Sequence, residues 1–209
     1  MGIETRNPAT EELLERFEPM TDVAIDAILE KASQTFEQFR HTDVTRRAAW
    51  LNAAADILDA EVDHWATILT TEMGKTLSSA AAEVQKSAQG CRYYAEHAET
   101  LLADEPLKGN DSHDFVRHLP LGPVLAVMPW NFPFWQVFRF AAPALIAGNV
   151  GLLKHASNVP RSALAIQHIL ERAGFPSGAF QTLLIDSTQV QRVLDDARVR
   201  AATLTGSEA

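Results

Sequence analysis

The chain has 209 residues, of which 46% are hydrophobic and 22% are charged, and its formal net charge at pH 7 is -9. These proportions are those of a soluble globular protein and exclude a disordered or fibrous chain. The acidic balance, without clusters of Lys and Arg, also excludes nucleic-acid binding through a basic face.

Helical patterns dominate the first half of the chain. Thr21 or Asp22 can cap a first helix, and a second helical stretch runs from about residue 45 until Gly74 stops it. A third stretch, 79–102, carries apolar residues at alternating steps of four and three, which places them on one stripe facing the core. Cys91 lies on this stripe, where a free cysteine is usually a small buried hydrophobe and not a nucleophile.

The architecture changes after residues 103–114, which are rich in Asp, Gly, Asn, Ser and Pro and are expected to form a loop. Beyond a possible short strand at 115–119, apolar strands alternate with helices. This alternation predicts right-handed crossovers and a mostly parallel, doubly wound, Rossmann-like sheet of the α/β class. We therefore expect a helical segment, 1–114, and an α/β portion, 115–209. The predicted strands are 124–128, 150–153, 180–185 and 199–205, and the predicted helices between them are 134–147, 162–173 and 188–194.

The last predicted strand leads directly into Gly206, Ser207 and Glu208, and no helix follows that would cover it. An α/β unit that lacks its helix exposes an apolar face of the sheet. We therefore expect the sheet to be incomplete at its carboxyl end and the natural fold to continue beyond Ala209.

Two loops after predicted strands are candidate sites, because ligands collect at the carboxyl ends of the strands in open α/β sheets. The first loop, 129–133, holds Trp130 and Asn131 between two prolines. The prolines restrict the backbone, and a preorganised amide N–H can stabilise the developing negative charge of an oxyanion. Such a turn is also common as a purely structural element.

The second loop presents Lys154, followed by His155, Ala156 and Ser157. A lysine at the carboxyl end of a strand, followed by small polar residues, can bind a ribose or a phosphate. This loop alone is weak evidence, because surface lysines are usually only solvated. Neither loop contains the G-x-G-x-x-G fingerprint of an ordinary Rossmann turn.

In their order and spacing, the two loops closely resemble the aldehyde dehydrogenase superfamily, and the resemblance extends over essentially the whole chain. Three further motifs carry it, namely Glu-Met-Gly-Lys at 72–75, Gly-Phe-Pro-Ser-Gly at 174–178 and Leu-Thr-Gly-Ser-Glu at 204–208. The lysine loop and the segment 140–145 look most like bacterial succinate-semialdehyde dehydrogenases of the NADP type. The resemblance implies NAD(P)-dependent oxidation of an aldehyde, succinate semialdehyde to succinate, by an enzyme expected to be a homo-oligomer in its full-length form.

The resemblance also implies a role for each matching position. Asn131 matches the catalytic side-chain donor to the oxyanion, and Trp130 lies beside the nicotinamide contacts. Lys154 matches the residue that bonds the adenosine ribose. Gly206 and Ser207 match the turn near the pyrophosphate, where a helix amino terminus can face negative charge. The expected cofactor-binding residues are Trp130, Asn131, Lys154, His155, Ala156, Ser157, Gly206 and Ser207.

Two positions bear on specificity. Ser157 stands where NAD-preferring relatives commonly carry a glutamate, and a serine hydroxyl can donate to a 2′-phosphate that a carboxylate would repel. The expected cofactor is therefore NADP, with NAD as a possible second. Arg139 lies eight residues after Asn131, where semialdehyde-oxidising relatives carry an arginine that pairs with the distal carboxylate of the substrate. The alternative for Arg139 is a core-edge arginine with a buried stem.

In the family, a cysteine thiolate attacks the aldehyde and a glutamate activates water, and both lie beyond the Gly206-Ser207 turn. Cys91 matches no catalytic motif. We therefore expect the catalytic domain to be absent and this chain to carry the cofactor-binding and oxyanion part only. The alternatives are a catalytically inactive truncated homologue, which binds nucleotide or associates with full-length subunits, and an unrelated nucleotide-binding α/β module.

Metal, membrane and secretion signals are weak. The seven histidines lack ligand spacing, so no metal site is expected. The apolar run 132–153 is interrupted by polar residues, Gly and Pro, and is expected to be buried core and not a membrane span. The polar amino terminus lacks signal and transit character, and the single cysteine, Cys91, fits a reducing compartment. We therefore expect a cytoplasmic protein.

Overall fold

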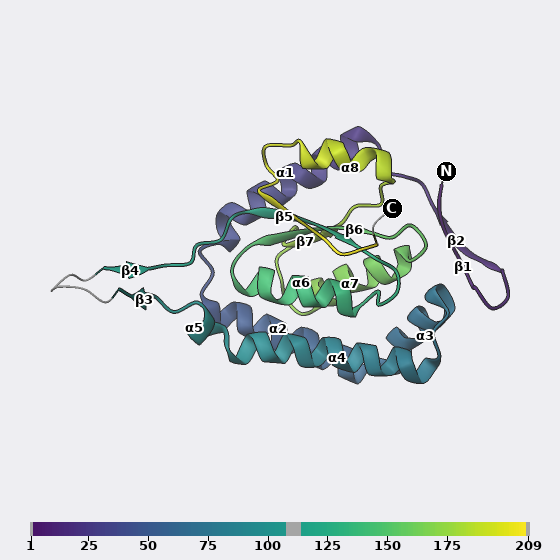
Figure 1. The fold of residues 1–209 in the computed structure, drawn as a ribbon, viewed down its shortest axis with the longest axis horizontal. Helices are drawn as coiled ribbons and strands as arrows, with labels where there is room; N and C mark the ends of the chain where they lie inside the picture. Colours follow the sequence, from purple (N-terminus) through teal and green to yellow (C-terminus); the bar gives the residue numbers. More distant parts are fainter. Residues whose placement is uncertain (1, 108–113, 208–209) are drawn as a thin grey trace.

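A four-stranded sheet forms the centre of the computed structural model, which describes residues 2–107 and 114–207 (Figure 1). The strand order is β7-β6-β5-β8, and every neighbouring pair is parallel. Because β6 and β7 follow on one side of β5 and β8 returns to the other, the strand order reverses between β5 and β8. The bounds are β5 Pro123–Met128, β6 Val150–His155, β7 Phe180–Thr182 and β8 Ala201–Leu204.

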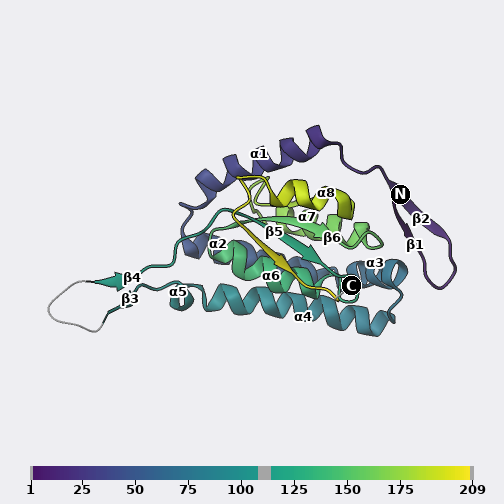
Figure 2. The same cartoon turned by 45° about the horizontal axis from the view of Figure 1, so that its top comes forward.

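Helices cover both faces of this sheet, as Figures 1 and 2 show. α6 and α7 lie on one face, α1 and α8 lie on the other, and α2 and α4 pack beneath α6 and α7 as a further layer. The prediction of a doubly wound α/β sheet preceded by helices is confirmed. The bounds are α1 Asp22–Phe39, α2 Val44–Ala60, α3 Val62–Met73, α4 Leu77–Glu96, α5 Ala98–Leu101, α6 Trp135–Ile146, α7 Pro160–Arg172 and α8 Ser187–Leu194.

Local sequence signals explain where the amino-terminal helices begin and end. Thr21 caps α1, because its Oγ1 accepts a hydrogen bond from the amide of Ala24 at 3.2 Å. Gly74 ends α3 in a left-handed conformation with φ +91°, and a side chain there would meet Pro8 at 2.6 Å. The second predicted stretch is wrong in one respect, since the chain breaks at Glu61 and forms two helices, α2 and α3.

Two small antiparallel pairs lie outside the main sheet. β1 (Ile3–Arg6) and β2 (Leu13–Phe17) form an amino-terminal hairpin that has no counterpart among the predicted elements. β3 (Glu105–Pro106) pairs with β4 (Phe115–Val116) in an arm that projects from the rest of the molecule (Figure 1). The predicted strand at 115–119 is therefore wrong in length, and it does not join the main sheet.

The apolar run 132–153 forms α6 and the start of β6, and both contribute buried side chains to the core. Among the helices of residues 2–107 and 114–207, none is long and apolar enough to cross a membrane. β8 is an edge strand that pairs only with β5, and Leu204 on it is 75% exposed.

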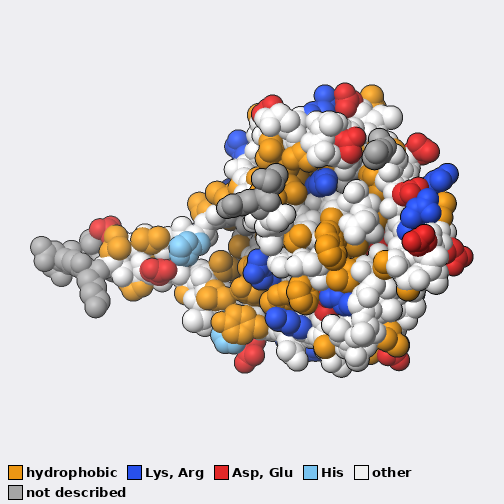
Figure 3. Space-filling view, turned by 45° about the vertical axis from the view of Figure 1, so that its right-hand side comes forward, with side chains coloured by type: hydrophobic (Ala, Val, Ile, Leu, Met, Phe, Trp, Pro, Cys, Tyr) orange, Lys and Arg blue, Asp and Glu red, His pale blue; other side chains and the backbone are white. Residues whose placement is uncertain are grey.

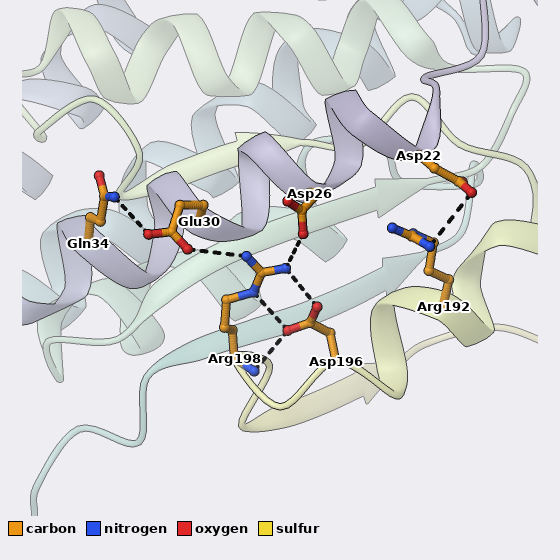
Figure 4. A network of polar contacts seen from close by, with 7 residues as sticks. All are labelled: Asp22, Asp26, Glu30, Gln34, Arg192, Asp196 and Arg198. Atoms are coloured by element: carbon orange, nitrogen blue, oxygen red, sulfur yellow. Dashed lines mark hydrogen bonds and ion pairs between the residues drawn. The ribbon is translucent and has the colours of Figure 1, made fainter.

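An arginine-centred network fixes α1 against the turn that leads into β8 (Figure 4). Arg198 donates to Asp26 at 2.5 Å and to Glu30 at 3.2 Å on α1, and it also binds Asp196 beside it in the turn. These carboxylates raise the pKa of the Arg198 guanidinium. Because the network joins segments about 170 residues apart in the chain, it helps to set the position of β8 next to β5.

Candidate functional site

The two candidate loops lie side by side at the carboxyl edge of the sheet. Met128, the last residue of β5, pairs with His155, the last residue of β6. The amide of Ala156 donates to the carbonyl of Met128 at 3.0 Å, which ties the start of the second loop to the start of the first. Both loops that were predicted as candidate sites therefore lie at one edge of the sheet. The first of them, residues 129–133, is called the elbow below.

A cleft of about 320 Å³ opens where the strand order reverses, between the ends of β5 and β8. The elbow residues Trp130 and Asn131 form one side, and Gly206 and Ser207 form the other. Trp130 is 49% exposed, and the side-chain amide of Asn131 makes no hydrogen bond to any described residue. The reversal point of an open α/β sheet is where ligands bind, so this cleft is the primary candidate site. Its lining residues are Pro129, Trp130, Asn131, Gln136, Thr205, Gly206 and Ser207.

The second loop lies one strand further along the same edge and does not line this cleft. Lys154 is half-buried, and burial lowers the pKa of its ammonium, an effect that the Asp186 carboxylate partly offsets. Ser157 is exposed. A partly desolvated cation beside an exposed hydroxyl suits an anionic or multiply hydroxylated ligand that lies across the strand ends.

The side chain of His155 is buried, unlike that of Ser157. Its ring is only 6% exposed, and burial lowers the pKa of the imidazole to about 4, so the ring is neutral at pH 7. Nε2 lies 3.0 Å from the carbonyl of Pro133, and Nδ1 lies 3.2 Å from the carbonyl of Met128, so the ring N–H of the neutral imidazole can donate to either carbonyl. The ring therefore links the two loops from inside.

Arg139 projects from α6 beside a second hollow of about 420 Å³. This hollow adjoins the cleft, because Gln136 and Thr205 line both. Arg139 as a whole residue is exposed. Arg139 therefore lines a hollow next to the cleft that Asn131 lines.

Three buried or nearly buried charged side chains behind the loops were not predicted to belong to the site. Glu83 on α4 accepts hydrogen bonds from the amides of residues 134 and 135, and it pairs with Lys75. Glu72 on α3 accepts from the amides of Arg161 and Ser162 at 2.7 and 2.8 Å. Burial raises the pKa of Glu72, although these hydrogen bonds act in the opposite direction. Two of the three belong to the motif at 72–75, which was the only sequence signal for them.

Cys91 is fully buried on α4, as its helical stripe predicted, and burial raises the pKa of its thiol to about 12. A thiol in this state is protonated at neutral pH and does not act as a nucleophile. Within the ranges 2–107 and 114–207, no three His, Cys, Asp or Glu side chains gather as a metal site would require.

The face that holds the strand ends is shown in Figure 3. Apolar side chains and Lys and Arg side chains gather near the middle of this face, and Asp and Glu side chains lie mostly towards its rim. On a chain of net charge -9, a local excess of cations is a feature that favours an anionic ligand.

A doubly wound sheet with its cleft at the reversal point defines an open α/β protein of the type that binds ligands at the carboxyl ends of its strands. The profile described as "Aldehyde dehydrogenase family" matches residues 1–209, and the chain belongs to this family. The predicted resemblance is thereby confirmed, and an unrelated α/β module is excluded.

Curated relatives and solved structures agree with this assignment. The chain is 57% identical to the NADP(+) succinate-semialdehyde dehydrogenase of Mycobacterium avium, covering 100% of this chain and 45% of the relative. It is 55% identical to a probable enzyme of the same name from Synechocystis, with 46% of that relative covered. Succinic semialdehyde dehydrogenase from Streptococcus pyogenes, solved with NADP+, superposes with a TM-score of 0.93 at 37% identity, covering 96% of this chain and 44% of that one. The chain thus spans about half the length of these relatives.

Proposed function

We propose that this chain forms the nucleotide-binding part of an NADP-dependent aldehyde dehydrogenase, and that succinate semialdehyde is its substrate. The observation that carries the proposal is the arrangement at one sheet edge of the elbow, the Gly206-Ser207 turn and the Lys154 to Ser157 loop. The names of the most similar relatives, which include NADP(+) and succinate semialdehyde, support the choice of cofactor and substrate.

The residues present fit a dinucleotide with a 2′-phosphate. Lys154 offers a partly desolvated ammonium, and the exposed Ser157 offers a hydroxyl donor without a carboxylate at that position. The exposed amides and small side chains at residues 206 and 207 leave room for a pyrophosphate, because a side chain added at Gly206 would meet nothing within 4 Å. When bound, the nicotinamide supplies a hydride acceptor.

The protein contributes orientation and electrostatic stabilisation to the reaction. The free side-chain amide of Asn131 donates to the aldehyde oxygen as negative charge develops there, and it needs little reorganisation because the elbow is already fixed. The guanidinium of Arg139 holds the distal carboxylate of the substrate. The nucleophile and the base of the family mechanism are not assigned to described residues, and buried Cys91 does not supply the thiolate.

Ser157→Glu tests the cofactor assignment. A carboxylate at this exposed position would repel the 2′-phosphate and accept from ribose hydroxyls, so NADP+ affinity should fall by about tenfold or more while NAD+ affinity stays or rises. Calorimetric titration of both nucleotides measures the ratio of their dissociation constants, with Ser207→Ala as a control outside the ribose end. An unchanged ratio would remove Ser157 from the cofactor site.

Arg139→Ala tests the substrate assignment in an active enzyme that contains this segment. Loss of a charged hydrogen bond to the substrate carboxylate should lower kcat/KM for succinate semialdehyde by about tenfold to a hundredfold. The same variant should change kcat/KM for butanal, which lacks the carboxylate, very little. Equal losses for the two aldehydes would show that Arg139 acts on the structure of the site and not on the substrate.

A nucleotide-binding homologue without turnover, or one that associates with full-length subunits, is the alternative. Formation of NADPH from succinate semialdehyde by the purified chain distinguishes the two. A cytoplasmic location and homo-oligomeric assembly stay predictions from the sequence.

A further inference from the structure

We propose that Lys75 and Glu83 are positioning residues that hold the elbow, and with it Asn131, in its binding geometry. This inference rests on the proposed function, because it concerns the site where nicotinamide and aldehyde would meet. Neither residue lines the cleft. They act from the helical layer behind it, through contacts that reach the main chain of the elbow and of the first turn of α6.

Glu83 connects α4 to the amino terminus of α6. Its Oε1 accepts from the amides of Phe134 at 2.8 Å and Trp135 at 3.0 Å, two donors that have no partner within their own helix. Its Oε2 pairs with the ammonium of Lys75. The Glu83 side chain is 2% exposed, so this carboxylate is committed entirely to the two amides and to Lys75.

Lys75 extends the connection to the elbow itself. Its ammonium donates to the carbonyl of Asn131 at 3.3 Å and lies 4.3 Å from the ring centroid of Phe132. Among described residues, no other hydrogen bond reaches the main chain of 129–131. The exposed residues 129–131 are therefore held by Pro129 and by one nearly buried cation, whose side chain is 7% exposed. His155 contacts the elbow further along, at the carbonyl of Pro133.

Glu72 lies near the Lys75–Glu83 pair in the sequence, but its hydrogen bonds support the other loop. Glu72 is equally buried and caps α7, at residues 161 and 162, in the manner in which Glu83 caps α6. Glu72 makes no hydrogen bond to the elbow. Glu72→Gln is therefore a matched control, because it changes a buried helix cap of the same type that makes no hydrogen bond to residues 129–133.

The main test is the double variant Lys75→Met/Glu83→Gln. Removing either partner alone leaves an unpaired buried charge, which can unfold the chain, whereas the double variant removes both charges together. We expect the 15N order parameters of the Trp130 and Asn131 amides to fall from about 0.85 to about 0.6, with those of residues 156–158 unchanged. Glu72→Gln should leave the order parameters of Trp130 and Asn131 as they are.

Ligand titrations provide the second readout. The double variant should bind NADP+ about tenfold more weakly, because a mobile elbow must be ordered on binding. Its affinity for adenosine 2′,5′-bisphosphate, which lacks the nicotinamide half, should equal that of the wild type. A general loss of structure would lower the affinity for both ligands alike.

The proposal would be overturned if the order parameters of Trp130 and Asn131 stayed unchanged, or if those of both loops fell equally. An equal loss of affinity for the two ligands would overturn it as well. If the wild type binds neither nucleotide but the elbow still loses order in the double variant, the positioning role stands and the proposed function fails. The order parameters and the titrations therefore separate the two claims.

Discussion

Replacing Glu72 with alanine should destabilise the protein by about 3 kcal/mol or more at pH 7, because three donors then lose a buried acceptor. The donors are the amides of Arg161 and Ser162 and the hydroxyl of Ser162, which bind the Glu72 carboxylate at 2.7, 2.8 and 2.6 Å. Glu72 is 2% exposed and Ser162 is fully buried, so water has little access to replace the acceptor. Urea unfolding monitored by circular dichroism measures the free energy of unfolding.

Glu61→Ala provides the matched control for this prediction. Glu61 also contacts α7, through a pair with Arg172 at the opposite end of the helix, but both side chains are about one-third exposed. Exposed pairs contribute little because solvent screens them, so this variant should differ from the wild type far less than Glu72→Ala does. A loss of equal size in the two variants would contradict the role given to the buried cap.

Acidification from pH 7 to pH 4 should remove about 3 kcal/mol of stability through His155 alone. Burial lowers the pKa of the folded imidazole from 6.5 to about 4, and the charge of Lys154 acts in the same direction. As the pH falls through 6.5, the unfolded chain takes up a proton that the folded chain does not accept until near pH 4. The contribution is therefore complete above pH 6.5 and is lost progressively between pH 6.5 and pH 4.

The difference in unfolding free energy between the wild type and His155→Gln isolates this contribution from the other groups that titrate in the same range. This difference should shrink by about 3 kcal/mol between pH 7 and pH 4. A difference that stays constant over this range would mean that the His155 ring is protonated in the folded protein at the same pH as in the unfolded chain.

Regular patterns made much of the fold predictable. Each strand of the main sheet and each helix between them was predicted to within about three residues, because short apolar runs and helical stripes leave few alternatives. The hairpin of β1 and β2 was missed because its residues are mostly polar and only Ile3 and Thr5 are buried. The break between α2 and α3 was missed because it occurs at Glu61, without a glycine or proline.

The site was predictable only where its residues carry local sequence signals. Prolines around Trp130-Asn131 and a lysine at a strand end are local signals, and the parallel sheet brings them to one edge. The contact between Glu83 and the amide of Phe134 joins residues 51 positions apart, and a glutamate in a helix normally indicates a solvated face. Only the packed structure reveals that this carboxylate is buried and that it caps α6.

A crystal structure of the protein with NADP+ tests the central claim most directly. We expect the nicotinamide half in the cleft between Trp130-Asn131 and Gly206-Ser207, and the 2′-phosphate within hydrogen-bond distance of the Ser157 hydroxyl. Nucleotide bound at the amino-terminal edge of the sheet, or bound without contact to either loop, would contradict the account.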